Sequence, residues 1–373
     1  MGFTILHTEW SKGWGGQEMR IVAESAAFRH KGYNMMIACH PDSEIFKEAQ
    51  VAGVPTIPLR IRNGMDLSAL IRCLWILRVN RVDLVHTHSS PDAWVCGMAA
   101  YLARVPVVRS RHLSTPISPG CISYFLYMKM ANSVITSGQT VKDLMVQRNR
   151  MLPERIVPIP AGVKVLRFSP GIDPMPIYRE FGLRAEDFIV GIVAVLRSWK
   201  GHQYLIKAVH TLVERGVPVK LLIVGAGPQE RNIRKKIQEL KLEDHVFLTG
   251  YRQDVPTMIS AMNCLVLPST ENEATPQVLP QALAMKVPVL GTNVGGIPEV
   301  VINYETGLLV PPRDPGALSE ALIWIYKRPQ EAAAMAERGY HYIHANFTFD
   351  KTIESTEQVY LNLLQPSRCL AGK

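Results

Sequence analysis

The stretch CLVLPSTENEATPQVLPQALAMKVPVLGTNVGGIPE, residues 264–299, decides the fold of this chain. Cys264–Leu267 is a short apolar run that predicts a buried parallel strand, and Val287–Leu290 predicts the next strand. Between them, Thr275 is typical of a helix N-cap and Pro276 of a first helical residue. A helix between two buried strands indicates a parallel α/β sheet.

The polar residues of this stretch stand where parallel sheets bind ligands. In open α/β sheets ligands lie outside the carboxyl ends of the strands, and free backbone N–H groups at a helix start suit a phosphate. With Pro276 as the first helical residue, those groups belong to Gln277, Val278 and Leu279. Glu273, in the preceding loop, would repel a phosphate. A carboxylate at this position is better explained as an acceptor of hydrogen bonds from the hydroxyl groups of a sugar.

Length and composition limit the classes of protein to which this chain can belong. A chain of 373 residues predicts two domains, and 47% hydrophobic with 20% charged residues is typical of a soluble globular enzyme. No signal peptide is apparent, and no apolar run reaches the roughly 18 residues that a membrane span needs, so we expect a cytoplasmic protein. The cysteines show no metal-binding or CxxC spacing and are expected as buried, reduced thiols: Cys39, Cys73, Cys96, Cys121, Cys264 and Cys369.

The net charge of +9 lies entirely in the first part of the chain. Residues 1–170 hold 20 Lys and Arg against 11 Asp and Glu, whereas residues 171–373 hold 21 of each. Such an excess of positive charge suggests an acidic partner, which could be an anionic membrane surface, a phosphorylated substrate or nucleic acid. The alternative is a solvated surface that is rich in arginine and binds no partner.

The first half alternates strands and helices. Its first strand, 3–7, leads through a glycine-rich loop with Gly15 and Gly16 into a helix over 17–30, an arrangement that lets backbone N–H groups approach a phosphate. Residues 116–130 (PISPGCISYFLYMKM) are unusually aromatic. They predict either a segment that meets lipid or a lipid-linked acceptor, or a helix packed on its own domain.

Three histidines end strands of this half. His86 and His88 close a strand over 84–88, and His112 follows a strand over 105–111. We expect one histidine of the HTH sequence to face a ligand and the other to point into the fold, and a purely structural role is the alternative for each. HTH is not spaced like a helical HExxH zinc site and no third ligand is apparent, so we expect no metal.

The second half repeats the pattern with stronger strands. At their carboxyl ends stand Arg197, Lys200, the turn 225–227 and Arg252. Two cations, a glycine turn and a helix start suit a diphosphate, and Gln281 is placed to bond the hydroxyls of a ribose. The residues therefore predict a site for a nucleoside diphosphate that carries a sugar.

Nearly the whole chain resembles the retaining glycosyltransferases of family 4. The resemblance is carried by the order and spacing of Gly15–Glu18, VDLVHTH (82–88), IVPIPAGV (156–163), VLRSWKG (195–201), LLIVGAGP (221–228), VFLTGYRQDVP (246–256), residues 266–301 and TGLLVPPRDP (306–315). It implies the GT-B fold, with two Rossmann-like α/β domains facing a central cleft. The expected parts are an acceptor domain over 1–165, a linker over 166–185, a nucleotide-sugar domain over 186–345, and a C-terminal helix over 346–373 that packs back on the first domain.

The resemblance also assigns roles. Lys200, with Arg197 nearby, would neutralise the departing diphosphate, and Glu273 would hold hydroxyls of the donor sugar. His88 would lie near the donor sugar and the acceptor. The expected substrate-binding residues are Gly15, Gly16, His112, Arg252, Thr275, Gln277, Val278, Leu279 and Gln281. The reaction would need no metal and no cofactor beyond the nucleotide sugar, and it would retain the anomeric configuration.

Some residues depart from the family pattern. Gln281 stands where the family has glutamate, Val195 where it has arginine, and Ala161 and Lys164 where it has Asn and Asp. Pro280 inside the predicted helix would remove a backbone donor and kink it. Lys200 and Glu273 are both present, so we expect activity.

The function expected is therefore hexosyl transfer from a UDP-, GDP- or ADP-sugar to a glycan or lipid-linked acceptor, as in envelope polysaccharide or lipopolysaccharide biosynthesis. We expect no nucleic-acid partner, and an anionic membrane surface as a peripheral one on the inner face of the membrane. The alternatives are a nucleotide-sugar epimerase of the same fold and a non-catalytic sugar-nucleotide binder.

Overall fold

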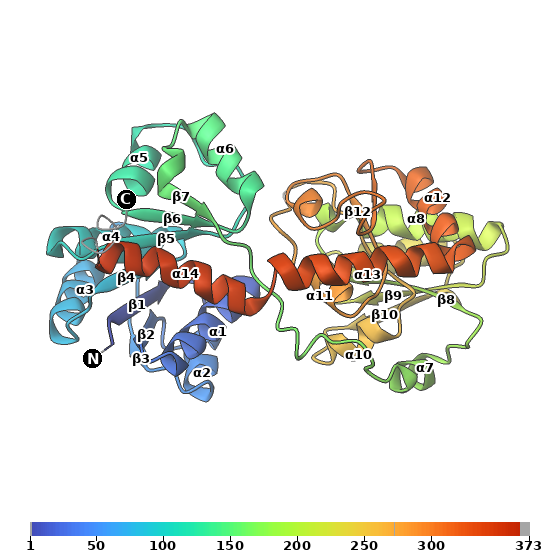
Figure 1. Cartoon of the computed structure of the whole chain (residues 1–373), viewed down its shortest axis with the longest axis horizontal. Helices are drawn as coiled ribbons and strands as arrows, with labels where there is room; N and C mark the ends of the chain where they lie inside the picture. The colour runs from blue at the N-terminus through green and yellow to red at the C-terminus, as the bar shows by residue number, and fades with distance from the viewer. Residues whose placement is uncertain (1, 272, 366–373) are drawn as a thin grey trace. The chain divides into compact units, whose positions relative to one another are not determined.

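The computed structural model describes residues 2–271 and 273–365, which form two compact units (Figure 1). Unit 1 contains residues 2–161 and 350–365, and unit 2 contains residues 162–349 apart from Asn272. Cys369 and the last eight residues of the predicted C-terminal helix lie outside the described residues. Within those residues, no helix combines the length and the apolar character needed to cross a lipid bilayer.

Unit 1 is built on a seven-stranded parallel sheet with the order β3-β2-β1-β4-β5-β6-β7. The strands are β1 (Thr4–Glu9), β2 (Asn34–Cys39), β3 (Thr56–Pro58), β4 (Leu84–Thr87), β5 (Val107–Arg111), β6 (Ser133–Thr136) and β7 (Ile156–Pro158). The helices are α1 (Gly16–His30), α2 (Glu44–Val51), α3 (Leu67–Val79), α4 (Ser90–Ala103), α5 (Cys121–Tyr124), a π-helical turn (Phe125–Lys129), α6 (Gln139–Asn149) and α14 (Phe349–Leu364). The order reverses between β1 and β4, which places the switch point of the sheet there.

The C-terminal helix α14 packs onto unit 1. Tyr360 is fully buried and its ring lies 5.3 Å from that of Phe28 of α1. Tyr33 donates a hydrogen bond to Glu357 at 2.9 Å, and Thr352 donates one to the Pro160 carbonyl at 3.0 Å. These contacts pack α14 against α1, the turn before β2 and the segment after β7 (Figure 1).

Unit 2 repeats the topology with six parallel strands in the order β10-β9-β8-β11-β12-β13. The strands are β8 (Phe188–Val193), β9 (Val219–Val224), β10 (Val246–Gly250), β11 (Cys264–Leu267), β12 (Val289–Thr292) and β13 (Leu308–Val310). The helices are α7 (Met175–Phe181), α8 (His202–Glu214), α9 (Glu230–Glu239), α10 (Val255–Ser260), α11 (Val278–Ala284), α12 (Pro315–Lys327) and α13 (Pro329–Asn346). Its switch point lies between β8 and β11.

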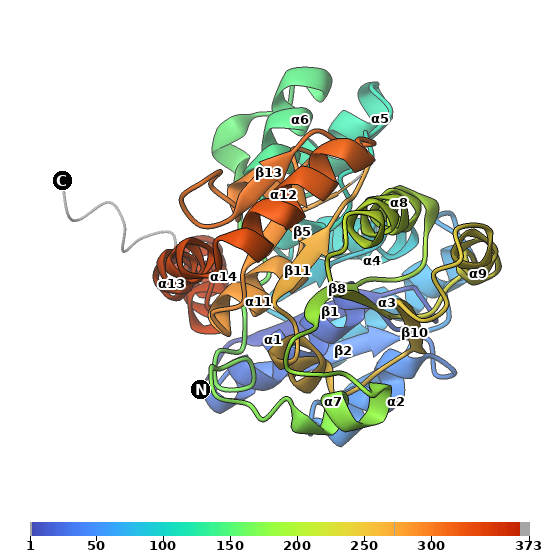
Figure 2. The same cartoon turned by 90° about the vertical axis from the view of Figure 1, so that its right-hand side faces the viewer.

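Apolar residues on both faces of the second sheet explain why its strands are continuous hydrophobic runs. One core joins alternate strand residues to Leu205 of α8, Ile233 of α9 and Leu318 of α12. The other joins the remaining strand residues to α7, α10, α11 and α13. Figure 2 shows these two groups of helices on opposite sides of the sheet. The fold prediction, two Rossmann-like α/β domains, is confirmed.

The stretch over 166–185 does not have the character of a linker. It contains α7, and Phe168, Ile177 and Leu183 are buried in the core of unit 2. Pro174 and Pro176 stand at the start of α7, where proline fits the first helical turn, so these prolines open a helix instead of marking a connection. The chain passes from unit 1 to unit 2 after Ala161 and returns after Phe349.

The five cysteines in the described part of the chain are unpaired. Four of them are buried, as expected, but Cys121 is exposed because it opens the short helix α5 at the surface.

Candidate functional site

The switch point of unit 2 brings Lys200 and Glu273 together. Lys200 follows β8, Glu273 follows β11, and the lysine Nζ donates to both carboxylate oxygens at 2.8 and 2.7 Å. Ser269 donates a third hydrogen bond to Glu273 at 2.5 Å. Glu273 is only 6% exposed, so the pair lies at the floor of the site, with the lysine side chain more open to solvent.

Glycines allow the two loops to approach the pair closely. Gly201 has φ +74°, and a Cβ there would lie 1.8 Å from the Pro268 carbonyl oxygen. Gly295 has φ +55°, and a Cβ there would lie 1.9 Å from the Glu273 carbonyl oxygen. Any larger residue would therefore push the loops apart at both points. The N–H of Thr270 bonds the Trp199 carbonyl at 2.8 Å and closes the arrangement.

The helix of the opening stretch begins later than predicted. Thr275 is not its N-cap: α11 starts at Val278 with Gln277 at the N-cap position. Thr275 instead donates to Glu299 at 3.1 Å, which ties this segment to the short 3-10 helix Ile297–Glu299. Pro280 then falls in the first turn, where no intrahelical donor is lost, so the expected kink has no cause. The N–H groups of Gln277, Val278 and Leu279 have no hydrogen-bond acceptor among the described residues.

The remaining predicted residues of unit 2 lie near this site without joining the pair. Arg197 is exposed and its guanidinium lies 5.0 Å from the centroid of the Trp199 ring. Arg252 donates four hydrogen bonds, two each to Glu180 and Asp254, so its donors are already engaged. Gln281 is half-buried on α11.

The switch point of unit 1 holds a chain of hydrogen-bonded side chains. His86 bonds Ser110 at 2.8 Å and the Tyr360 hydroxyl at 2.7 Å. Tyr360 bonds His7 at 3.2 Å, and the chain continues from His7 to His88 at 2.9 Å and from His88 to His112 at 3.0 Å. The expectation that His86 and His88 face opposite ways is wrong: residues two apart on a strand share a face, and their rings stack at 4.3 Å.

Burial keeps these four rings neutral. Desolvation lowers the pKa of His7 and of His112 to about 3, with the Arg20 charge as a further cause. The pKa values of His86 and His88 are also lowered well below 6.5, first by burial and then by the neighbouring histidines. Nitrogens of His7, His86 and His88 lie within 4.8 Å of one another, which is close enough for the three rings to hold a metal ion. His7 is therefore a third potential metal ligand, one that was not apparent in the sequence.

A carboxylate network surrounds this chain at the start of α1 and α4. Asp92 accepts from Thr8 at 2.6 Å and from the backbone N–H of His88 at 3.0 Å and of Ser89 at 2.8 Å. Burial, followed by the Glu9 charge, raises the pKa of Asp92 to about 7. Of the expected phosphate-binding glycines, Gly15 donates its N–H to the Glu18 carboxylate at 2.9 Å and Gly16 is the first residue of α1.

A cavity of about 560 Å³ opens at this end of the first sheet. Its polar wall includes His88, His112 and Gln17, and its apolar wall includes Trp94 and Ile122. Of the predicted unit 1 residues, His88 and His112 line it. A small ligand would fit, because ligand sites are concave and mostly apolar with a few placed polar groups.

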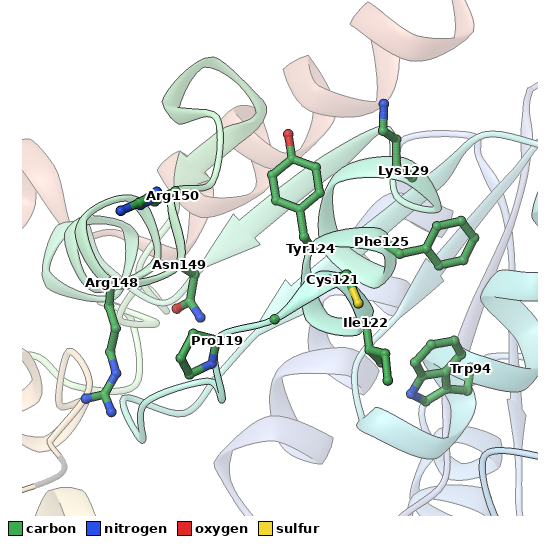
Figure 3. Close-up of a pocket in the computed structure, with 11 residues that line it drawn as sticks. Trp94, Pro119, Cys121, Ile122, Tyr124, Phe125, Lys129, Arg148, Asn149 and Arg150 are labelled. Carbon is green, nitrogen blue, oxygen red and sulfur yellow. The ribbon is translucent and has the colours of Figure 1, made fainter.

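A second, larger cavity of about 1000 Å³ adjoins the first and shares Trp94 and Ile122 with it. Figure 3 shows Trp94 of α4 and Ile122 of α5, with Tyr124 from the end of α5 and Phe125 from the following π-helical turn. The charged side chains that line it are all cationic: Lys129, Arg148 and Arg150. The aromatic segment over 116–130 packs on its own domain through the buried Leu126 and Tyr127, while Ile122 is 67% exposed.

Sequence reasoning missed four residues of unit 1 that shape this region: His7, Asp92, Arg109 and Tyr360. His7 and Arg109 lie inside β1 and β5, which were identified by their runs of apolar residues, and both side chains are buried. Tyr360 is 274 residues from its partner His86, and no local pattern signals so distant a contact.

Comparisons with known proteins agree with this geometry. The family described as Glycosyltransferase Family 4 matches residues 14–167, and the family described as Glycosyl transferases group 1 matches residues 176–342. N-acetyl-alpha-D-glucosaminyl L-malate synthase of Bacillus anthracis is 26% identical over 312 residues, 81% of each chain. UDP-Gal:alpha-D-GlcNAc-diphosphoundecaprenol alpha-1,3-galactosyltransferase of Escherichia coli is 25% identical over 325 residues, 83% of each chain.

Solved structures share the fold over nearly the full length. A glycosyltransferase from Rickettsia africae superposes with a TM-score of 0.90 at 22% identity, covering 98% of this chain and 100% of that one. HepE of Anabaena in complex with UDP-glucose gives a TM-score of 0.84 at 21% identity, covering 96% and 99%. Together, the paired family matches, the relatives and the fold establish that the chain belongs to the glycosyltransferases of the family 4 type, with the GT-B fold.

Proposed function

We propose that the protein transfers a sugar from a nucleotide-diphosphate donor to an envelope-type acceptor, with retention of the anomeric configuration. The observation that carries the proposal is the Lys200–Glu273 pair at the switch point of unit 2. A cation suits the diphosphate and a buried acceptor-only carboxylate suits the sugar hydroxyls. Because the two groups touch, the sugar and the diphosphate would meet at one point, which is where the bond between them breaks.

The chemistry follows from that placement. A hydroxyl oxygen of the acceptor forms a bond to the anomeric carbon while the bond from that carbon to the phosphate oxygen breaks. In front-face attack the departing phosphate takes the hydroxyl proton, so no protein base is required. Lys200 would stabilise the charge that develops on the leaving diphosphate, a contribution that is large in a closed site. The proposal needs no metal, because that lysine supplies the positive charge.

The acceptor is proposed to carry a lipid. The cavity in Figure 3 offers apolar and aromatic walls, which suit a prenyl chain, and the three cations Lys129, Arg148 and Arg150, which suit the anionic membrane surface that would hold it. The E. coli relative is named for a diphosphoundecaprenol acceptor. We therefore place the protein on the inner face of the cytoplasmic membrane, bound peripherally through its basic unit. Co-sedimentation with anionic vesicles that is insensitive to salt would contradict this placement.

The donor is tested by thermal unfolding in the presence of nucleotide sugars. UDP-glucose and UDP-galactose come first, since those donors appear in the names of relatives, followed by GDP- and ADP-sugars. A ligand present at about 100 times its dissociation constant adds ~2.7 kcal/mol of apparent stability. For a unit of this size that corresponds to a rise of roughly 5–11 °C in the midpoint of unfolding.

The matched controls are the free sugar and the nucleoside monophosphate, which lack the diphosphate. Neither should reproduce the rise. A Glu273→Gln variant should lose the extra stabilisation given by the nucleotide sugar over the nucleoside diphosphate alone. If no nucleotide sugar shifts the transition, or if Glu273→Gln distinguishes the two ligands as well as the native protein does, the proposed roles fail.

A further inference from the structure

Arg109 is a buried cation in unit 1 that forms no ion pair with any described residue. It lies on β5 and is 5% exposed. Its Nε and Nη1 atoms are sealed from solvent and have no hydrogen-bond acceptor among the residues that the structure describes. Its guanidinium carbon lies over the Tyr127 ring, 4.0 Å from the ring centroid.

The neighbouring carboxylates are engaged elsewhere. Asp92 accepts three hydrogen bonds, from Thr8 and from the backbone of His88 and Ser89, and it forms no ion pair with Arg109. The other buried arginine of this region is paired: Arg20 contacts Glu24 at 2.5 Å and donates to the Ile159 carbonyl at 3.1 Å. Among the described residues Arg109 thus differs from Arg20 in forming no ion pair, although its charge is felt by the nearby Asp92 carboxyl, whose pKa it lowers against the raising effect of burial.

An unpaired buried charge is costly, and it persists where something compensates it in the working state. Arg109 lines the cavity of about 560 Å³ together with His88 and His112. The lining also includes Arg111, and its single carboxylate, that of Glu18, is already bonded to the N–H of Gly15. The cavity therefore has an excess of positive charge and neutral donors, which favours an anionic occupant.

We propose that Arg109 binds a phosphate group of the acceptor inside this cavity. The Nη2 end of the guanidinium, which is not among the sealed nitrogens, would meet the phosphate oxygens while the acceptor hydroxyl lies toward His88 and His112. This inference rests on the proposed function, because it takes the cavity of unit 1 to be the acceptor site. It adds the requirement that the acceptor be a phosphate ester and names the residue that selects it.

The test uses the full chain and three variants. Arg109→Met keeps the length of the side chain and removes the charge, and Arg109→Lys keeps the charge without the fork of donors. Arg155→Met is the matched control: this arginine of unit 1 donates to the Met128 carbonyl and does not line the cavity. Calorimetric titrations use inorganic phosphate and glucose 6-phosphate, with glucose as the uncharged comparator.

Native protein and Arg155→Met should bind the two phosphates and not glucose. Arg109→Met should lose roughly 10–100-fold in affinity, as expected for a hydrogen bond to a charged group, and Arg109→Lys should lose less. The ligand-free Arg109→Met protein should unfold at the same temperature as the native protein or higher, since a buried charge without an ion pair has been removed. Equal phosphate affinity in native protein and Arg109→Met would overturn the proposal.

A second arm identifies the source of the phosphate. Co-sedimentation is measured with phosphatidylcholine vesicles that contain or lack undecaprenyl phosphate. If binding requires undecaprenyl phosphate and is lost in Arg109→Met, the phosphate is lipid-linked; if only glucose 6-phosphate responds, the acceptor is a soluble sugar phosphate. The nucleotide-sugar response of unit 2 is recorded for every variant. If Arg109→Met retains it, a lost phosphate response reports on the acceptor subsite alone and not on the donor function.

Discussion

Replacing Lys200 with methionine tests the Lys200–Glu273 pair through stability as well as activity. The substitution keeps the stem and removes the ammonium that donates to both oxygens of Glu273. The carboxylate side chain is 8% exposed, and among the described residues it would keep the Ser269 hydroxyl as its one hydrogen-bond donor. The lysine side chain is 20% exposed and is free to turn to solvent if its partner is removed instead.

This difference in exposure sets the expected magnitudes. Removing one partner of a buried pair costs about 3–5 kcal/mol when the other charge stays buried. Since the site is partly open, we expect ~2–4 kcal/mol for Lys200→Met and ~1–2 kcal/mol for Glu273→Gln. For unit 2 the larger loss corresponds to roughly 4–16 °C in the midpoint of its transition.

The assay is scanning calorimetry of the native protein, both single variants and the double variant. The double variant should lose less than the sum of the single losses, because the second substitution removes the charge that the first left unpaired. Additive losses, or a greater loss for Glu273→Gln than for Lys200→Met, would refute the assignment of this pair as a buried, mutually dependent unit.

Three further predictions concern other parts of the molecule. Unit 1 should lose stability as the pH falls below 6.5, because its four buried histidines have lower pKa values in the folded state than in the unfolded state. The unfolded state therefore binds protons first, and each histidine lowers the free energy of unfolding by up to ~1.4 kcal/mol per pH unit. A calorimetric midpoint of unit 1 that does not fall between pH 7.5 and 5.5 would contradict this. Tyr360→Phe removes the hydroxyl shared by His86 and His7, so the free energy of unfolding of unit 1 should fall by ~1–3 kcal/mol while nucleotide-sugar binding to unit 2 stays unchanged. An unaltered unfolding transition of unit 1 would count against the hydrogen-bond chain. Gln281→Glu should tighten nucleotide-sugar binding by roughly tenfold if this position bonds ribose hydroxyls, whereas weaker or equal affinity in a titration would place the ribose elsewhere.

Much of the fold was predictable because strand and helix periods are local. Buried parallel strands read as continuous apolar runs, and the switch points follow from their order, which is why Lys200 and Glu273 were both assigned to one site. The start of α11 was misplaced because the local signals of Thr275 and Pro276 were outweighed by packing. Gly296 approaches the backbone of Thr275 so closely that a Cβ would lie 2.7 Å from its nitrogen.

The parts that could not be predicted depend on contacts between distant residues. Tyr360 reaches the histidines from the last helix, and the unpaired state of Arg109 is visible only when all of its neighbours are known. A buried arginine in a strand gives no signal in the sequence that separates a paired charge from an unpaired one. The cavity walls likewise combine residues from α4, α5 and β5.

The most direct test of the central claim is the rate at which the preferred nucleotide sugar is cleaved by native protein and by Lys200→Met. The nucleoside diphosphate released is measured at saturating donor, so that weaker binding does not lower the rate. If Lys200 stabilises the leaving diphosphate, the variant should be slower by roughly 10²–10³-fold, as for the loss of one donor to a developing charge. A variant that still binds the donor and releases diphosphate at the native rate would contradict the account.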